Sequence, residues 1–410
     1  MSYKEKVFDK VDVHELLRKY GSPLYVYDED ILRERCREMK NLLSYPHFKV
    51  NYSAKANTNV ELLRIIHEEG LDVDAMSPGE MYLEMKAGFT SDQIMFIGNN
   101  VPQEELKYAV DRGIYISVDS LSQLETLGEI NRGGNVCLRI NPGIGAGHHE
   151  KVITGGKKAK FGIAIEDLPL AHEIADRYQM TITGINQHIG SLFLETDEYL
   201  AAAAKLLDLA TTLPTVQTVD IGGGMGIPYR HGVESRLDLA GLGSELDQLV
   251  ETWVEAHWPI TLRIEPGRYI VAECSALLGK VTAVKENYGR VFLGCDVGFN
   301  TLVRPAMYDS YHEISVVPAN NRAYAEYELP AYLVGPICES GDILSHDRPL
   351  PFCAVGDGLI IHDAGAYGYT MASGYNSRPL PPEVLITSDG KVRVIRKGQA
   401  LEDLWEDPEA

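Results

Sequence analysis

The sequence predicts an α/β barrel followed by a β-domain, on two observations. Between residues 48 and 268, short β-branched runs alternate with amphipathic stretches, which is the βαβα pattern of a parallel sheet. After about residue 275 the chain changes to short alternating runs with Gly, Pro and Asp-Gly turns, and helical patterning is largely lost. The length agrees with more than one domain, because 410 residues exceed what one hydrophobic core usually supports.

Eight runs in the first region are candidate strands. They are residues 48–54, 71–76, 94–99, 114–120, 135–141, 181–189, 216–222 and 260–266. Between them lie helical patterns with apolar residues at i, i+3 and i+4 spacing, such as those at 60–69, 78–88, 103–113 and 194–213. Eight strand–helix units predict a closed, TIM-type (β/α)8 barrel.

The two ends of the chain complete the expected organisation. Residues 22–28 (SPLYVYD) are strand-like before the barrel begins, and we expect this strand to join the sheet of the C-terminal domain. The alternating runs after the barrel predict antiparallel β-structure. The expected division is an N-terminal segment at 1–27, the barrel at 28–275 and the β-domain at 276–410.

Composition excludes several classes of function. The net charge of −21 would repel nucleic acid and anionic lipid, so we expect neither as a partner, and an anionic substrate would need local arginines. No apolar run approaches the roughly 20 residues needed to span a bilayer. The six cysteines lack CxxC spacing and the N-terminus lacks an apolar export region, which predicts reduced thiols and a cytoplasmic protein. We expect no metal centre.

Polar and unusual residues cluster at the C-terminal ends of the predicted strands, the face where barrel enzymes hold their active sites. We therefore expect residues far apart in sequence to converge on one pocket. They are Lys55, Asp74, Asn99, Asn100, His188, Ser191, Gly222 to Gly224, and Glu265 to Arg268.

Lys55 follows directly after the first predicted strand, in NYSAKAN (51–57). A lysine at the mouth of a barrel can be desolvated, and the neutral amine that results can attack an aldehyde. The alternative is a surface or salt-bridged lysine, which this motif alone does not exclude.

The segment DIGGGMGIPY (220–229) has four glycines within five positions after a strand. Glycine lets the chain approach a phosphate closely, and successive backbone N–H groups can bind it, so the segment predicts an anion site. The alternative is a tight strand-to-helix turn, although we expect such a turn to need only one glycine or two. The pattern is not the G-x-G-x-x-G dinucleotide fingerprint.

Glu265 ends the eighth predicted strand, in LRIEPGRYIVA (262–272), and His188 lies in QHIGS (187–191). A carboxylate can face a pyridine nitrogen and keep it protonated, and an imidazole can stack on an aromatic cofactor. The hydroxyl of Ser191 can bind phosphate. Taken singly, a Glu–Arg salt bridge and a structural histidine are the alternatives, so the prediction depends on the combination.

Seven motifs occur in the order and spacing of a known family. They are YSAKAN, QHIGS, DIGGGMG, EPGR, RPAMYDSYH (304–312), CESGD (338–342) and GAYGYTMASGYNSRP (365–379). Together they resemble the diaminopimelate decarboxylase branch of the fold-type III pyridoxal-phosphate (PLP) enzymes. The resemblance covers about residues 20–400, and it implies a PLP-binding barrel with a β-domain and a homodimer with active sites at the subunit interface.

The resemblance also implies roles in cofactor binding. Lys55 resembles the lysine that holds pyridoxal 5'-phosphate as a Schiff base, Glu265 the partner of the pyridinium nitrogen, and His188 the residue stacked on the ring. Tyr367 resembles a tyrosine that touches both cofactor and substrate. Related enzymes often carry a second histidine where this chain has Asn186, which puts one outer contact of the site in doubt. The remaining cofactor-binding residues implied are Asp74, Ser191, Gly222, Gly223, Gly224, Gly267 and Arg268.

The implied reaction is decarboxylation of meso-2,6-diaminopimelate, a small amino acid, to L-lysine and CO₂. Cys338 is the proton donor that the family pattern implies, whereas a small buried hydrophobe is the alternative for this residue. The far end of the substrate carries an ammonium and a carboxylate. We expect Glu339 to hold the ammonium, and Arg304, Tyr308 and Arg268 to hold the carboxylate.

Three other functions stay open. The first is decarboxylation of another amino acid, such as a carrier-bound glutamyl group or a D-amino acid. The second is a racemase on the same barrel, for which Tyr367 or Cys338 would be the second base. The third is a non-catalytic PLP carrier, which would lack the β-domain and CESGD. The Gly-rich basic segment at 142–163 is either a lid over the substrate or a surface loop.

Overall fold

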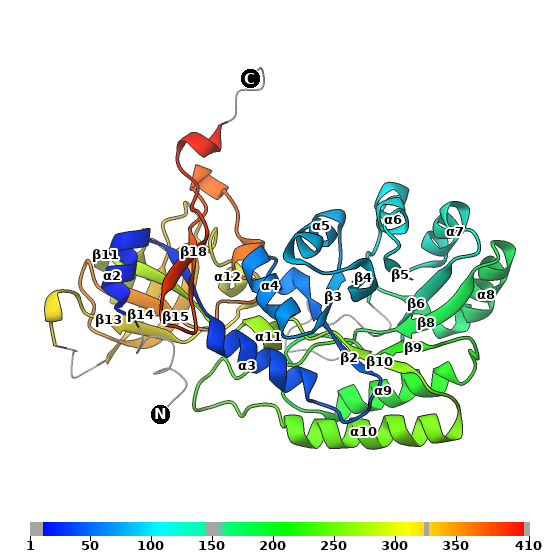
Figure 1. The fold of residues 1–410 in the computed structure, drawn as a ribbon. Helices are drawn as coiled ribbons and strands as arrows, with labels where there is room; N and C mark the ends of the chain where they lie inside the picture. The colour runs from blue at the N-terminus through cyan, green and yellow to red at the C-terminus, as the bar shows by residue number, and fades with distance from the viewer. Residues whose placement is uncertain (1–10, 144–155, 157–158, 324–327, 406–410) are drawn as a thin grey trace. The chain divides into compact units, whose positions relative to one another are not determined.

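A computed structural model of the chain describes residues 11–143, 156, 159–323 and 328–405. The chain forms two compact units (Figure 1). One contains Arg33–Ile227 and Ser235–Ile270, and the other contains Met1–Leu32, Pro228–Glu234 and Val271–Ala410 so far as these are described. The division of the sequence at residues 27 and 275 stays a prediction.

The first unit is a closed barrel of parallel strands, which confirms the predicted fold. The order around the ring is β5 (Tyr115–Val118), β4 (Ile94–Phe96), β3 (Asp72–Ala75), β2 (Phe48–Ser53), β10 (Thr261–Ile264), β9 (Thr218–Asp220), β8 (Thr181–Asn186) and β6 (Asn135–Asn141). Pairing of β5 with β6 closes the ring. Each predicted run contains one of these strands, and the polar ends of several runs lie beyond the ladder because the chain turns there toward the next helix.

Helices surround the barrel (Figure 1): α3 precedes its first strand, β2, and each of the others follows a strand. Their bounds are α3 Glu29–Lys40, α4 Val60–Glu68, α5 Pro78–Ala87, α6 Gln103–Val110, α7 Leu121–Ile130, α8 Leu168–Arg177, α9 Asp197–Ala210 and α10 Leu239–Ala256. Polar side chains start several of them. Asn59, Ser77 and Ser120 each accept a backbone N–H from the first turn of α4, α5 and α7. Such caps satisfy donors that no helical carbonyl can reach.

The second unit is built on a sheet with the order β15 (Ile343–Pro351), β14 (Glu328–Val334), β12 (Arg290–Cys295), β11 (Ser275–Asn287), β1 (Leu24–Asp28), β17 (Glu383–Ile386) and β18 (Val392–Arg396). Strand β16 (Gly358–Ile361) pairs with β11 and with β13 (Ile314–Val317). The N-terminal strand therefore joins the sheet of the C-terminal segment, as the sequence predicts.

The sheet is mixed, which corrects the prediction of antiparallel structure. Strand β1 runs antiparallel to β11 but parallel to β17, and β12 runs parallel to β14. The alternation of side chains along a strand reports which face is buried. It does not report the direction of the neighbouring strand, so these two parallel pairs were not visible in the sequence.

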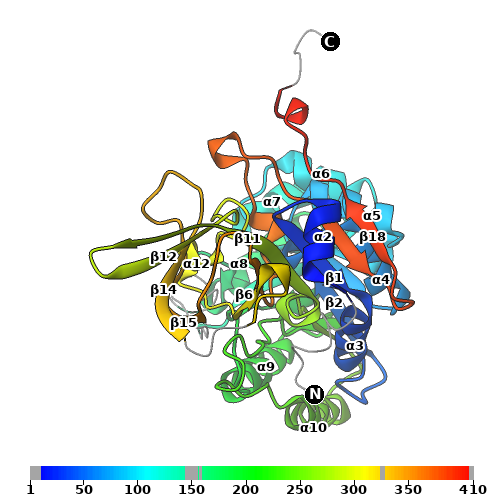
Figure 2. The ribbon, with the colours of Figure 1, turned by 90° about the vertical axis from the view of Figure 1, so that its left-hand side faces the viewer.

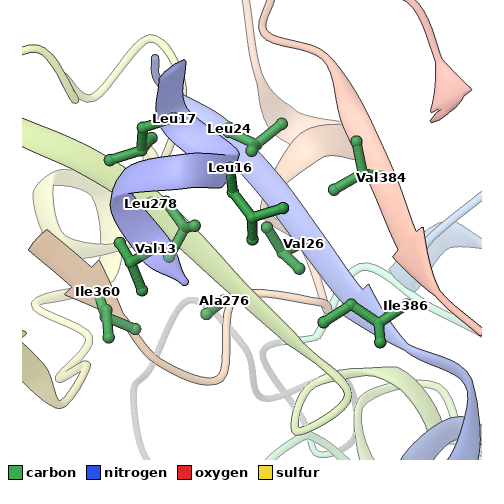
Figure 3. Packing of buried hydrophobic residues seen from close by; sticks show 10 residues of the cluster. All are labelled: Val13, Leu16, Leu17, Leu24, Val26, Ala276, Leu278, Ile360, Val384 and Ile386. Carbon is green, nitrogen blue, oxygen red and sulfur yellow. The ribbon is translucent and has the colours of Figure 1, made fainter. Parts of the chain in front are cut away.

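Helix α2 (Val13–Tyr20) packs on this sheet with its apolar face, and Figure 2 shows it against β1. The cluster drawn in Figure 3 joins α2, β1, β11, β16 and β17 in one core. Its members are Val13, Leu16, Leu17, Leu24, Val26, Ala276, Leu278, Ile360, Val384 and Ile386. Burying a Val, Leu or Ile side chain stabilises a fold by about 1.5–3 kcal/mol, so this cluster ties the N-terminal strand to the C-terminal ones.

Candidate active site

Lys55 and the first carboxyl of the site lie at the ends of neighbouring strands. Ser53, the last residue of β2, pairs in register with Asp74 of β3, and the Ser53 hydroxyl donates to Asp74 Oδ2 at 3.1 Å. Lys55 follows in one 3-10 turn, Ala54–Ala56, between two fully buried alanines, and is itself half-buried. This turn places the lysine at the carboxyl end of the barrel.

Three carboxyl groups, those of Asp74, Asp220 and Glu265, are buried at this end of the barrel. Burial raises the pKa of all three; Glu265 raises those of Asp74 and Asp220 further. The positive charges of Lys55 and Arg139 oppose the rise in the pKa of Glu265. Within the described chain, Asp74 Oδ1 has no hydrogen-bond partner, whereas the carboxyl groups of Asp220 and Glu265 form a hydrogen bond with each other. A buried polar oxygen without a partner is costly, so the Asp74 oxygen is suited to receive a hydrogen bond from a bound ligand.

His188 is a neutral imidazole in this structure. It follows β8, and its Nδ1 accepts the backbone N–H of Gly223 at 3.2 Å, which leaves the proton of the neutral ring on Nε2. Burial lowers the pKa of His188 well below its usual value, and the charges of Lys55 and Arg139 lower it further. An uncharged ring can stack on a planar cofactor at low cost, because no charged group loses its contact with water when the cofactor covers it.

The glycines of DIGGGMG are required by backbone packing. A Cβ at Gly222, Gly223, Gly224 or Gly226 would lie 1.9–2.7 Å from a carbonyl oxygen of a neighbouring segment. The expectation that such a turn needs only one glycine or two is therefore wrong, and the number of glycines does not by itself indicate phosphate. What the glycines achieve is close approach of the chain after β9 to the segments after β8 and β10.

Ser191 and Arg268 form a polar pair near the same turn. Arg268 is buried, and its Nη2 donates to the Ser191 hydroxyl at 3.0 Å. A Cβ at Gly267 would come within 3.0 Å of the Ser53 Cβ, so glycine lets the chain after β10 pass close to the end of β2. A hydroxyl beside a buried guanidinium is suited to bind a phosphate group.

Sequence reasoning missed Arg139, which lies in the middle of β6. It is 6% exposed, and its Nε lies 3.7 Å from Asp119 Oδ1. Burial lowers the pKa of the Arg139 guanidinium, and the negative charges of Asp119 and Glu265 oppose that change. Arg139 is therefore a buried cation that interacts with the carboxyl cluster. The signal in the sequence was a charged residue inside an otherwise apolar strand, NVCLRIN. Asp220 lay in a recognised motif, but its buried carboxyl was not singled out.

The other residues expected to contact substrate belong to the second unit. Arg304 begins α12 (Arg304–Tyr308) and is 1% exposed; its Nη1 donates to His312 Nε2 at 2.8 Å, and its guanidinium lies 4.7 Å from the centre of the Tyr229 ring. Tyr308 ends the same helix and is half-buried. Tyr367 is also half-buried and has a positive φ of 57°.

Cys338 and Glu339 are exposed in the same unit. Cys338 is therefore not buried within its own chain. The structure thus groups the expected site residues in two sets. Lys55, Asp74, His188, Ser191, Gly222 to Gly224, Glu265, Gly267 and Arg268 belong to the barrel unit, and Arg304, Tyr308, Cys338, Glu339 and Tyr367 to the other.

Asn186, the departure from the family pattern, is buried inside the barrel, where its Oδ1 accepts the Ser117 hydroxyl at 2.6 Å. The predicted lid at 142–163 lies largely outside the described residues. In the described part of the chain, no group of three or more His, Cys, Asp or Glu side chains is placed to hold a metal ion. The same part contains no helix with the length and apolar character needed to cross a membrane.

The barrel site fits pyridoxal phosphate group by group. Lys55 offers an amine for the aldehyde, and Glu265 offers a buried carboxyl for the pyridine nitrogen. His188 offers a neutral ring for the cofactor face, and the Ser191–Arg268 pair suits the phosphate. The fold and the site are therefore those of a PLP-dependent barrel enzyme.

Comparison with known proteins narrows this class. Residues 29–272 match the family described as pyridoxal-dependent decarboxylase, pyridoxal binding domain. Diaminopimelate decarboxylase of Methanothermobacter thermautotrophicus is 44% identical over 96% of this chain and 93% of its own length, and that of Archaeoglobus fulgidus is 38% identical over 97% and 95%. The solved Helicobacter pylori diaminopimelate decarboxylase with L-lysine superimposes with a TM-score of 0.88 at 31% identity, covering 96% of this chain and 98% of that one. This chain belongs to the diaminopimelate decarboxylase family.

Proposed function

We propose that this protein is a PLP-dependent carboxy-lyase that converts meso-2,6-diaminopimelate to L-lysine and CO₂. The observation that carries the reaction type is the half-buried Lys55 amine, which interacts electrostatically with the buried carboxyls of Asp74 and Glu265. The substrate is supported by relatives of that name over nearly the whole chain, and by the complex of the Helicobacter pylori relative with L-lysine.

Residues of the barrel unit would hold the cofactor. Lys55 Nζ would bind its aldehyde carbon, Ser191 and Arg268 its phosphate, and His188 its ring face. Bound PLP supplies an electron sink for the electron pair that CO₂ leaves behind. Glu265 would meet the pyridine nitrogen with its carboxyl group; burial raises its pKa, and the charges of Lys55 and Arg139 oppose that rise.

Residues of the second unit would act on the substrate. The Cys338 thiol would donate its proton to the substrate Cα after CO₂ has left, and its exposure leaves it accessible to do so. Arg304 and Tyr308 would bind the distal carboxylate and Glu339 the distal ammonium. Nη1 of Arg304 is already oriented by the uncharged acceptor His312 Nε2, which fixes the guanidinium without neutralising it.

The site would be completed by a second copy of the chain. We propose a homodimer in which the Cys338–Glu339 segment of one subunit reaches the Lys55 site of its partner. We also propose a cytoplasmic location, since all six cysteines are free thiols, as expected in a reducing compartment.

Two alternatives have specific sequence requirements. The non-catalytic carrier would lack the β-domain and CESGD, and both are present in this chain. A racemase would need a base on each side of the substrate Cα, so incubation in deuterated water with chiral analysis of recovered substrate distinguishes it from a decarboxylase.

The test is CO₂ release from a panel of amino acids by the purified protein with PLP. We expect release from meso-diaminopimelate, with L-lysine as the product, and little release from ornithine, arginine, a D-amino acid or a glutamyl thioester. Glu339→Ala should keep the cofactor absorbance and lose the preference for diaminopimelate, at a cost of about 2–5 kcal/mol for an unpaired distal ammonium. Asp347→Ala, at another exposed acidic residue of the same unit, is the matched control.

Equal release from another amino acid would overturn the proposed substrate. Racemisation without CO₂ release would overturn the reaction type. Lysine production unaffected by Glu339→Ala would remove this residue from the substrate site.

A further inference from the structure

Two adjacent residues, Tyr375 and Asn376, bind two adjacent residues of the CESGD segment. The backbone N–H of Cys338 donates to Asn376 Oδ1 at 3.1 Å, and Asn376 Nδ2 donates to Cys338 Sγ at 3.2 Å. The Tyr375 hydroxyl donates to Glu339 Oε1 at 2.6 Å. One turn of the chain thus contacts the thiol and the carboxylate that the proposed function assigns to proton donation and substrate binding.

The orientation of the Asn376 amide is determined by the backbone. The Cys338 N–H can only donate, so the atom that faces it must be the amide oxygen. The NH₂ group then points to Cys338 Sγ and can only donate to it. The hydrogen bond at the sulfur is therefore of the kind that stabilises a thiolate rather than one that accepts the thiol proton.

The turn that holds this amide is itself well supported. Asn376 has φ 57° and ψ 25°, a left-handed conformation that Asn, Asp and Gly adopt more readily than other residues. The Tyr375 ring stacks on Phe299 with centroids 5.7 Å apart, and the Phe299 N–H donates to Asp342 Oδ1 at 2.7 Å. Asp342 is the last residue of CESGD and Cys338 the first. The turn therefore contacts the start of the motif directly through Asn376, and its end through Phe299.

We propose that Asn376 is a positioning residue for the Cys338 thiol, holding Sγ in one place and stabilising the thiolate that proton donation leaves. This inference rests on the proposed role of Cys338. In that step the S–H bond breaks, a C–H bond forms at the substrate Cα, and the S–H electron pair stays on sulfur. An N–H donor binds the charged sulfur more strongly than the neutral thiol, so it lowers the barrier of this step.

Two substitutions separate positioning from mere support of the turn. Asn376→Asp keeps the left-handed backbone and the acceptor for the Cys338 N–H, but it replaces the donor at Sγ with a negative oxygen. Asn376→Gly keeps the backbone and removes both contacts. A purely structural role would make Asp the milder change, whereas thiolate stabilisation makes Asp the more harmful one.

The readouts are steady-state kinetics and the rate of Cys338 alkylation by iodoacetamide in the holoenzyme. The other five cysteines, Cys36, Cys137, Cys274, Cys295 and Cys353, are buried, so mass spectrometry of the Cys338 peptide follows one accessible thiol. We expect both kcat and the alkylation rate to fall in the order wild type, Gly, Asp. The Asp variant should lose about 10- to 100-fold, as for one hydrogen bond to a charged group, with KM within about twofold.

Tyr375→Phe is the matched control, because it keeps the ring that stacks on Phe299 and removes only the hydroxyl bound to Glu339. It should raise KM for diaminopimelate and leave Cys338 alkylation unchanged. Unchanged cofactor absorbance in all three variants verifies that they are folded. Suppose that Cys338→Ala abolishes turnover. The inference would then be overturned by an Asn376→Asp variant with wild-type kcat, or by one that is less impaired than Asn376→Gly in both readouts. Full activity of Cys338→Ala would instead overturn the donor role itself, and the inference with it.

Discussion

Asp220 and Glu265 are two buried acids at the ends of neighbouring strands, and their surroundings shift their pKa values to different extents. Asp220 pairs in register with Arg263 of β10, two residues before Glu265. Burial raises the pKa of both carboxyls, and Glu265 raises that of Asp220 further, whereas Lys55 and Arg139 oppose the rise at Glu265. Of the pair, Asp220 therefore has the pKa that its surroundings raise further.

This difference predicts the effect of neutralising each acid. Glu265→Gln should lower kcat by about 100-fold or more, because an amide cannot stabilise positive charge on the pyridine nitrogen. The loss of cofactor affinity should be much smaller. Asp220→Asn should cost less than Glu265→Gln, since Asn resembles the protonated acid and can still accept the Gly222 N–H. Steady-state kinetics and absorbance titration with PLP measure both quantities. Equal losses of kcat and affinity would indicate that Glu265 has only a structural role.

At the scale of elements, helix α5 contains a buried glutamate, Glu84, that its sequence pattern did not indicate. Glu80, in the first turn of the helix, accepts the Met76 N–H at 2.6 Å, whereas neither carboxyl oxygen of the fully buried Glu84 has a hydrogen-bond partner among the residues that the structure describes. Burial raises the pKa of Glu84 well above its usual value, and Asp74 and Glu80 raise it further. The helix therefore brings a carboxyl whose pKa is raised next to the carboxyl cluster of the barrel.

Stability should consequently depend on pH through Glu84. Above its ordinary value of 4.5, the unfolded chain releases the proton of Glu84 while the folded chain keeps it, so this residue makes stability fall as pH rises. Glu84→Gln removes that loss. The variant should be more stable than wild type at pH 8, by about 1–3 kcal/mol, and this advantage should shrink as the pH approaches 5.

Melting of the cofactor-bound protein at pH 5.5 and at pH 8 checks this expectation. Glu251→Gln, at an exposed position in α10, is the control and should change stability little at either pH. A Gln variant that is less stable than wild type by the same amount at both values would mean that Glu84 is ionised in the folded protein.

At the scale of the whole molecule, the residues of the proposed reaction are divided between two units. Lys55, His188 and Glu265 belong to the barrel unit, and Cys338 and Glu339 to the unit built on the mixed sheet. Neither unit alone contains both the amine and the thiol. In the proposed dimer, each complete site would therefore need one unit from each subunit.

Subunit mixing tests this arrangement. Lys55→Ala and Cys338→Ala proteins should each be inactive, the first because it lacks the amine and the second because it lacks the proton donor. Random exchange of equal amounts should restore about a quarter of wild-type activity, because half of the dimers are mixed and each of these has one intact site. Mixing Lys55→Ala with Glu265→Gln should restore nothing, since both changes lie in the barrel unit. With subunit exchange verified by mass-tagged protomers, a lack of recovery in the first mixture would place Lys55 and Cys338 in the site of one subunit.

The sequence by itself determined the eight barrel strands, the β-rich C-terminal segment and the N-terminal strand that joins it. These features follow from side-chain periodicity and from turn residues, which are local properties of the chain. The motifs likewise predicted Lys55, His188 and Glu265 as site residues, because each lies just after a strand where a barrel presents its active face.

Tertiary structure alone decided which distant groups meet. It showed that β1 and β17 run parallel, that neighbouring carbonyl oxygens require the glycines after β9, and that Arg139 and Glu84 border the carboxyl cluster. It also showed that Asn376 binds Cys338 from 38 residues away. The physical reason is the same in each case. Strand direction, burial of a charge and the partner of a hydrogen bond depend on the segments that pack together, and no periodicity within one segment encodes the identity of the next.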